Sequence, residues 1–449
     1  MGSIVLIPAV LSIWFCLRRS PVDALLSVYL TAVLFCPDWA RWVLPGLPDP
    51  TCDEAAILPL VVIVFLRFRP RWKLSLLDFL IFPLPLIMSV SEYVNAGYAD
   101  AQNLIFDMLA SSIFPYMMAK LLINSHGLRV RFAKHIVLCL SLLFFTSLYE
   151  FKFAVNPFHA LFNRFFPGQG DGWITTFRYG FPRVAGPFSH AILNGVVLMI
   201  GLQLAVWLKD SRLWERRKSM LSVSALLIEL LITFTRGPQI GALLAYCIHW
   251  LGGGRDVKRR ARLLGAAAIL IGIPVAVWFQ SYASVGRIAA RSEAQETAAY
   301  RKEMVDKYIA IARSKSWLGW GTSGWPRVAG MASIDNYYLL LSLRHGFIAT
   351  SLLIGILLST MFRLFRNGMR YAPSAAPARS LSFALAGIYA ALTFSLATVY
   401  MGLNVVPLFF LLTGVTENYL LAGGDKALRL RADPALPEKK ALQFRRVIA

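Results

Sequence analysis

Apolar segments long enough to cross a bilayer as helices fill almost all of this 449-residue chain, and two polar segments, 150–188 and 280–335, interrupt them. A helix that crosses the hydrocarbon core needs about 20 apolar residues, and it satisfies its backbone hydrogen bonds internally. Because 57% of the residues are hydrophobic, the sequence predicts an all-α, polytopic integral membrane protein. The two polar segments are then its largest parts in water.

The apolar runs predict 12 or 13 transmembrane helices. They lie at 4–17, 24–44, 55–66, 76–94, 104–123, 135–148, 191–208, 221–234, 240–251, 263–279, 337–364, 381–400 and 405–421. The first three runs are short or interrupted, so 12 helices with an inside N-terminus is the alternative to 13 with an outside N-terminus. The chain divides into N-terminal helices (1–149), a first loop (150–188), central helices (189–279), a large loop (280–335), C-terminal helices (336–424) and a basic tail (425–449).

The formal charge of +22 comes from short clusters of Lys and Arg between the apolar runs, which argues against a nucleic-acid partner. These clusters lie at 18–19, 67–73, 129–134, 209–218, 255–262, 363–379 and from 426 onward. Two helices fit between consecutive clusters, so all of them fall on one side of the membrane. The positive-inside rule makes that side the cytoplasm, and the basic tail is attracted to anionic membrane lipids. Both long loops are therefore expected on the outer face.

The five cysteines have no spacing typical of a metal or redox site, and no metal or other cofactor is predicted. Cys36 and Cys52 fall near one outer-face loop, where a disulfide in an oxidising compartment is an alternative to two free thiols. In the large loop, Met304, Tyr308 and Ala312 share one face at helical spacing. This pattern predicts an amphipathic helix over 294–313.

Three stretches of the predicted outer face stand out together. They are RVAGPFSHAILNG (183–195), TFTRGPQIGALLA (233–245), and 300–346, which ends in SIDNYYLLLSLRHG. Their combination resembles the O-antigen ligase and Wzy-type polysaccharide polymerase superfamily. Its members share an arginine–glycine segment that opens a span, a Ser/Thr-Arg-Gly turn between spans, and a large periplasmic loop. That loop ends in a Gly-x-Gly and an Asn-aromatic-leucine stretch, and the likeness covers about residues 178–364.

The resemblance implies a glycosyltransferase of the bacterial inner membrane that acts at the periplasmic face on an undecaprenyl-diphosphate-linked glycan, without a metal. Guanidinium groups bind a diphosphate through paired hydrogen bonds and stabilise its departing charge. Arg183 and Arg236 lie at the right predicted depth for this role, and Arg291 and Arg301 in the large loop are further candidates. The alternative for each is a solvated or turn-capping charge.

Ligases of this superfamily usually carry a histidine just before the Asn-aromatic stretch, where this chain has Asp335 followed by Asn336. A carboxylate is a suitable general base for a sugar hydroxyl, but aspartate is also a common helix N-cap, and both interpretations stay open. Asn336 and His190, at the starts of two spans, are expected to contact the substrate, with a structural hydrogen bond as the alternative for His190. The absence of the histidine favours a polymerase.

The function predicted is polymerisation of lipid-linked oligosaccharide repeat units for exopolysaccharide or O-antigen, with a flippase and a chain-length regulator as protein partners. One alternative is a ligase that passes glycan to a lipid A core. The other is a flippase or transporter, which Asp78, Asp107 and Glu229 favour because they fall within predicted spans.

Overall fold

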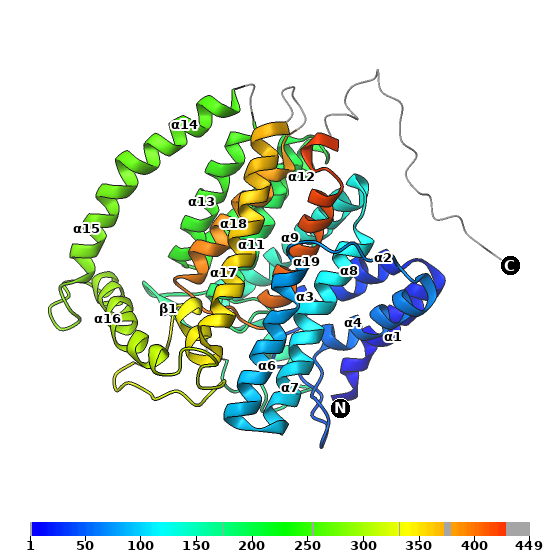
Figure 1. Cartoon of the computed structure of the whole chain (residues 1–449), viewed down its shortest axis with the longest axis horizontal. Helices are drawn as coiled ribbons and strands as arrows, with labels where there is room; N and C mark the ends of the chain where they lie inside the picture. Colours follow the sequence, from blue (N-terminus) through cyan, green and yellow to red (C-terminus); the bar gives the residue numbers. More distant parts are fainter. Residues whose placement is uncertain (1, 174, 254–255, 332, 372–378, 428–449) are drawn as a thin grey trace.

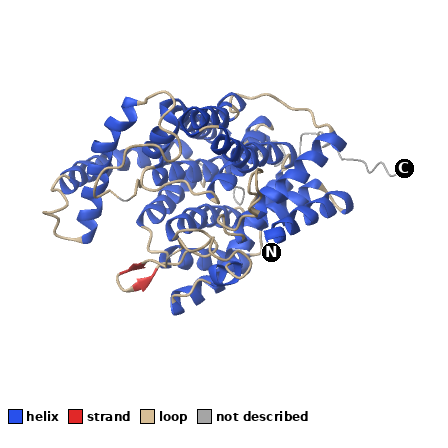
Figure 2. Cartoon of the chain, turned by 90° about the horizontal axis from the view of Figure 1, so that it is seen from below, coloured by secondary structure: helices blue, strands red, loops and turns tan. Residues whose placement is uncertain are grey.

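The computed structural model describes residues 2–173, 175–253, 256–331, 333–371 and 379–427, and most of them are helical. The helices are α1 (Ile7–Arg18), α2 (Pro21–Ala24), α3 (Leu30–Phe35), α4 (Cys52–Ile63), α5 (Asp78–Ile81), α6 (Pro83–Ala96), α7 (Tyr98–Met108), α8 (Phe114–Leu122), α9 (His126–Phe153), α10 (Pro157–Phe162), α11 (Ala191–Asp210), α12 (Arg216–Ile232), α13 (Arg236–Leu251), α14 (Val257–Ala267), α15 (Ile273–Ala283), α16 (Glu293–Ser314), α17 (Tyr337–Tyr371), α18 (Leu381–Leu396) and α19 (Val405–Leu421). Short 3-10 or π segments are η1 (Gly2–Leu6), η2 (Leu25–Tyr29), η3 (Val64–Phe68), η4 (Leu109–Ile113) and η5 (Ala268–Gly272). The strands β1 (Phe177–Arg178) and β2 (Phe181–Pro182) form one small hairpin, red in Figure 2.

Within the described residues, six helical segments are long and apolar enough to cross a membrane: Asp78–Ala96, Tyr98–Leu122, His126–Phe153, Ala191–Asp210, Val257–Ala283 and Tyr337–Tyr371. Four shorter apolar helices accompany them, and every predicted apolar run contains a helix. The chain is thus an all-α, polytopic membrane protein, as predicted. Two predicted boundaries are wrong. The run at 24–44 leaves its helix at Phe35, just before Pro37, and the helix of the run at 135–148 already begins at His126. Of the predicted basic tail, residues 428–449 lie outside the described residues.

Helix α11 lies at the centre of the bundle and packs against α9, α12, α13 and α18 (Figure 1). Its sequence, AILNGVVLMIGLQLAVWLKD, is apolar on every side, as expected of a helix surrounded by others. Two glycines allow the close approach of its neighbours, because a Cβ on Gly195 would meet Thr235 and one on Gly201 would meet Leu140. This packing fixes the end of α11 where the polar loops gather.

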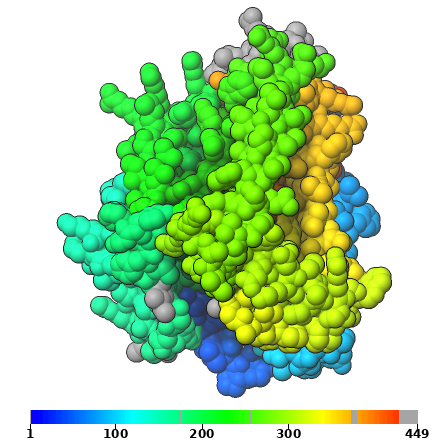
Figure 3. All heavy atoms as spheres, turned by 90° about the vertical axis from the view of Figure 1, so that its left-hand side faces the viewer, coloured from blue at the N-terminus to red at the C-terminus, as the bar shows by residue number. Residues whose placement is uncertain are grey.

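Helices α14 and α15, joined by η5, stand apart from the bundle on the left of Figure 1 and cross the face shown in Figure 3. Only Ala283 is buried along the segment Val257–Ala283. The segment leads into α16. This helix, Glu293–Ser314, confirms the amphipathic helix predicted over 294–313 in the large loop. Met304, Tyr308 and Ala312 are buried there against residues that include Trp325 and Leu343.

The acidic side chains of the predicted spans have local partners. Asp78 accepts hydrogen bonds from Lys120 at 2.7 Å and from the Tyr116 hydroxyl at 2.6 Å. Asp107 pairs with Arg41 at 3.2 Å and Glu417 with Arg363 at 2.6 Å. Glu229 differs, because it accepts one hydrogen bond from the Ser147 hydroxyl at 2.5 Å and its other carboxylate oxygen is buried without a hydrogen-bond partner. The ion pairs hold helices together, so Asp78, Asp107 and Glu417 have a structural explanation that needs no proton relay.

Helix α17 is broken at Gly346, where φ is 79° and ψ is 176°, and this corrects the prediction of one continuous span over 337–364. The Gly-x-Gly segment 319–321 of the large loop fills the break. Trp320 and Gly321 donate their backbone N–H groups to the carbonyls of Leu343 and Arg344, each at 2.8 Å, and Phe347 N–H donates to Ser316 O at 2.7 Å. Loop backbone thus replaces the hydrogen bonds that the break removes from the helix.

We expect Gly346→Ala to destabilise the protein by about 3 kcal/mol, because a side chain at this φ is strained and its Cβ would collide with the Trp317 carbonyl. Gly355→Ala in the same helix is the matched control, since a Cβ there would meet only Leu80, at an ordinary 3.6 Å. Thermal unfolding of the purified variants in detergent measures both effects. Equal stability of the two variants would show that the break does not need glycine.

Candidate active site

Four arginines gather where the two long loops meet the helix ends. Arg178 and Arg183 come from the first loop, Arg236 opens α13, and Arg301 lies in the middle of α16. The charges of Arg178 and Arg236 act on Arg301, and the charge of Arg178 acts on Arg183. We call these four residues the arginine cluster.

The hairpin β1–β2 holds the first-loop arginines against the turn between α12 and α13. Arg178 Nη1 donates to Phe234 O at 3.0 Å, and Arg183 Nε donates to Thr233 O at 3.3 Å. Both carbonyls belong to the C-terminal end of α12, where the helix dipole favours positive charge. In return, Arg236 Nη2 donates to the hydroxyl of Tyr179 in the hairpin turn. The Ser/Thr-Arg-Gly turn and the first loop therefore form one unit.

The end of the first loop is also held by side chains of two bundle helices, α9 and α11. Glu150, near the end of α9, accepts the backbone N–H groups of Ala185 at 3.1 Å and Gly186 at 2.9 Å. Asn194 in α11 donates to Val184 O at 3.2 Å. Because Glu150 and Asn194 belong to helices of the bundle, the position of the adjacent Arg183 depends on the packing of α9 and α11.

Burial and repulsion from neighbouring arginines make the charges of Arg183 and Arg301 costly without an anion. Burial, and then the charge of Arg178, lower the pKa of Arg183 to about 10. Burial also lowers the pKa of Arg301; the charges of Arg178 and Arg236 add to this effect, and Asp335 opposes it. Arg301 further donates to Thr398 O at 3.3 Å. A phosphate group bound here would relieve the repulsion and gain paired hydrogen bonds.

Asp335 is the carboxylate whose charge acts on Arg301, and it acts on His190 as well. Its Oδ1 accepts a hydrogen bond from Ser333 Oγ at 2.9 Å, and the side chain is half-buried. The N-cap of α17 is Asn336, whose Oδ1 accepts the Leu339 N–H at 3.1 Å. The capping interpretation of Asp335 is therefore wrong, while a substrate contact by Asn336 stays a prediction.

His190 is the N-cap of α11, because its Nδ1 accepts the Ile192 N–H at 3.1 Å. Burial and the charge of Arg183 lower its pKa to about 4, although Asp335 opposes them. The ring is thus neutral at pH 7, and with Nδ1 as an acceptor its proton sits on Nε2. The structural hydrogen bond weighed for His190 is present, and the neutral ring keeps one N–H donor, at Nε2.

Arg291 lies apart from the arginine cluster. It precedes α16, its side chain is exposed, and its backbone N–H donates to Gln295 Oε1 at 2.8 Å. The eight helical steps from Glu293, the first residue of α16, to Arg301 correspond to about 12 Å along the helix axis, and Arg291 lies before that helix. The structure therefore brings together Arg183, Arg236, Arg301, His190 and Asp335, but not Arg291.

Arg178 and Tyr400 are the neighbours that the sequence prediction missed. Arg178 had a usable signal, since Tyr179 and Gly180 form a two-residue turn with φ of 53° and 80°, the pattern of a tight hairpin that would point Arg178 back at Arg183. Tyr400 follows α18. Burial raises its pKa, and the negative charges of Asp38 and Asp335 add to this effect. No local pattern marks Tyr400.

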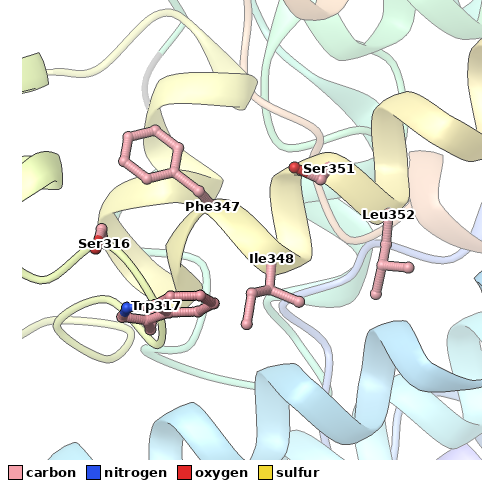
Figure 4. A pocket seen from close by; sticks show the side chains of 6 residues that line it. All are labelled: Ser316, Trp317, Phe347, Ile348, Ser351 and Leu352. Carbon is pink, nitrogen blue, oxygen red and sulfur yellow. The ribbon is translucent and has the colours of Figure 1, made fainter.

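A shallow groove of about 450 Å³ lies beside the break in α17 (Figure 4). Its lining consists of Ser316, Trp317, Phe347, Ile348, Ser351 and Leu352. These side chains carry no charge, so the groove suits an apolar group and not a diphosphate. Within the described residues, no group of three or more His, Cys, Asp or Glu is placed to hold a metal ion.

The fold and the site define a polytopic helical membrane protein with a cluster of arginines where its two long loops meet the helix ends. The family model for the O-antigen ligase matches residues 221–354, which confirms the resemblance to the O-antigen ligase and Wzy-type superfamily. The matched segment contains Arg236, Arg301, Asp335 and the break in α17, whereas Arg178, Arg183 and His190 precede it. No curated relative matches the chain.

Proposed function

We propose that this protein is a polysaccharide polymerase of the bacterial inner membrane. It would transfer a growing glycan from undecaprenyl diphosphate to the terminal sugar of an incoming lipid-linked repeat unit, on the periplasmic face. The observation that carries the proposal is the arginine cluster facing one carboxylate, Asp335. A diphosphate leaving group and an acceptor hydroxyl need those two kinds of group side by side.

In the proposed reaction, the acceptor oxygen attacks the anomeric carbon of the donor glycan. A new carbon–oxygen bond forms, the bond from that carbon to the diphosphate oxygen breaks, and undecaprenyl diphosphate leaves with the electron pair. The hydroxyl proton passes to the Asp335 carboxylate. Arg236, Arg301 and their neighbours stabilise the charge that develops on the diphosphate, and His190 Nε2–H is positioned to orient a sugar or phosphate oxygen.

A ligase that transfers glycan to a lipid A core is the second candidate, and the matching family model is described by that activity. Asp335 in place of the ligase histidine favours the polymerase. The cationic partners of Asp78 and Asp107 argue against a transporter. A flippase that delivers repeat units and a chain-length regulator are the protein partners we expect.

Deleting the gene should leave cells with single repeat units in place of long polymer, while their lipid A core still accepts other glycans. Gel electrophoresis of extracted glycolipids, with the gene restored on a plasmid as the control, measures this. A deletion strain that accumulates full-length polymer on undecaprenyl diphosphate would identify a ligase instead.

A further inference from the structure

The segment that connects α3 to α4 folds back on itself between two cysteines. Cys36 is the residue that ends α3, and Cys52 is the first residue of α4. An antiparallel bridge joins Arg41 to Thr51, and Trp42 N–H donates to Pro50 O at 3.1 Å. The two ends of the connection are therefore drawn together.

The two thiols are neighbours. The Cys52 side chain is hydrogen-bonded to Cys36, and both residues pack into one apolar cluster with Trp39 and Trp42. Cys52 is buried and Cys36 half-buried. The other cysteines are separate from this pair: Cys16 lies in α1, Cys139 in α9 and Cys247 in α13.

The connection also supports the first loop of the candidate active site. Arg41 N–H donates to Gln169 Oε1 at 2.9 Å, and Gln169 Nε2 donates back to Arg41 O at 3.0 Å. Asp38 accepts from Ser189, the residue before His190, at 3.5 Å. A constraint on the segment 37–51 would therefore stiffen the support of the loop that leads to His190.

We propose that Cys36 and Cys52 form a disulfide bond in the mature protein. Two thiols would lose two protons and two electrons to form one S–S bond, and a disulfide-bearing oxidant would be reduced to two thiols by exchange. The proposal rests on the periplasmic orientation of the proposed function, because disulfides persist in oxidising compartments. The bond would close a 15-residue connection, 37–51, against the two helices.

The chemistry also indicates when the bond forms. The hydrogen bond with Cys52, and then burial, raise the pKa of Cys36, and a thiol with a raised pKa holds little of the attacking thiolate at pH 7. Exchange is therefore fastest before α4 packs onto its neighbours, when the thiols are still exposed. Purified protein reduced after folding should reoxidise slowly.

The test counts thiols in the full-length protein. Membranes are quenched in acid, denatured and blocked with N-ethylmaleimide, then reduced and treated with a maleimide that adds a visible mass. We expect two added tags after reduction and none when reduction is omitted. Cys36→Ser and Cys52→Ser should each abolish both tags, and Cys247→Ser, the control, should leave both. Because the wild-type count needs no variant, a folding failure of a variant leaves the result valid; no tags on the wild-type protein would overturn the proposal.

A second arm separates the disulfide from the orientation on which it rests. Gly172 and Ser323 are exposed, one in each long loop. An impermeant maleimide should label the Gly172→Cys and Ser323→Cys variants in intact spheroplasts. Lys258→Cys, exposed in a basic cluster, should stay protected until lysis. If the loop cysteines are labelled but the wild-type protein shows only free thiols, the disulfide alone is overturned. Loops protected until lysis would overturn the periplasmic site as well.

Discussion

Replacing Arg236 by Ala should lower glycan polymerisation by about two to three orders of magnitude, the loss typical when one donor to a developing anion is removed. Arg301→Ala should have a similar effect, because Arg301 belongs to the same arginine cluster and the charge of Arg236 acts on it. Arg236→Lys should recover little, since a lysine lacks the planar fork that binds two phosphate oxygens. Polymer yield per amount of membrane-inserted protein is the measurement.

Arg291→Ala is the matched control, because Arg291 is exposed and precedes the same helix that carries Arg301. It should retain near wild-type activity. If the Lys variants of Arg236 and Arg183 are also near normal, these arginines are solvated loop charges. If Arg291→Ala loses as much activity as Arg301→Ala, the site extends beyond the arginine cluster.

Asp335→Asn should lower polymerisation by about two to four orders of magnitude, the usual contribution of a general base. The fold should survive, because Asn336 caps α17 and the Ser333 hydroxyl can still donate to an amide oxygen. Asp306→Asn, at an exposed position of α16, is the control for removing one negative charge from the large loop. Polymer length and yield, together with thermal unfolding of each purified variant, check the prediction.

Asn336→Ala separates the capping role from a substrate contact. Loss of the N-cap should cost about 1 kcal/mol of stability and only a modest part of the activity. An active Asp335→Asn variant beside an inactive Asn336→Ala variant would reverse the roles assigned to the two residues.

The helices were predictable because apolar length alone decides which segments enter a bilayer. The break in α17 was not, since Gly346 lies in an apolar run and glycine is common in transmembrane helices. The break is stabilised by the docking of the segment 319–321, which donates N–H groups to Leu343 O and Arg344 O. That contact is tertiary, and no local pattern reports it.

The sequence predicted which residue types form the candidate site, but only partly which individual residues lie in it. Arg236 and Asp335 were found from their places in the motifs that resemble the superfamily, the Ser/Thr-Arg-Gly turn and the position before the Asn-aromatic stretch. Which loop charges join them depends on how α16 docks, and this docking brings in Arg301 and leaves Arg291 outside. The N-cap of α17 differed by one residue from the alternative considered, because the sequence does not show which of two adjacent polar residues begins a helix.

Reconstitution tests the central claim most directly. The purified protein, in vesicles that contain only an undecaprenyl-diphosphate-linked repeat unit, should build a ladder of longer chains and release one undecaprenyl diphosphate for each new bond. The Arg236→Ala and Asp335→Asn proteins should build none. If the wild-type protein leaves the repeat unit unchanged and transfers glycan only when a lipid A core is added, the polymerase assignment is contradicted.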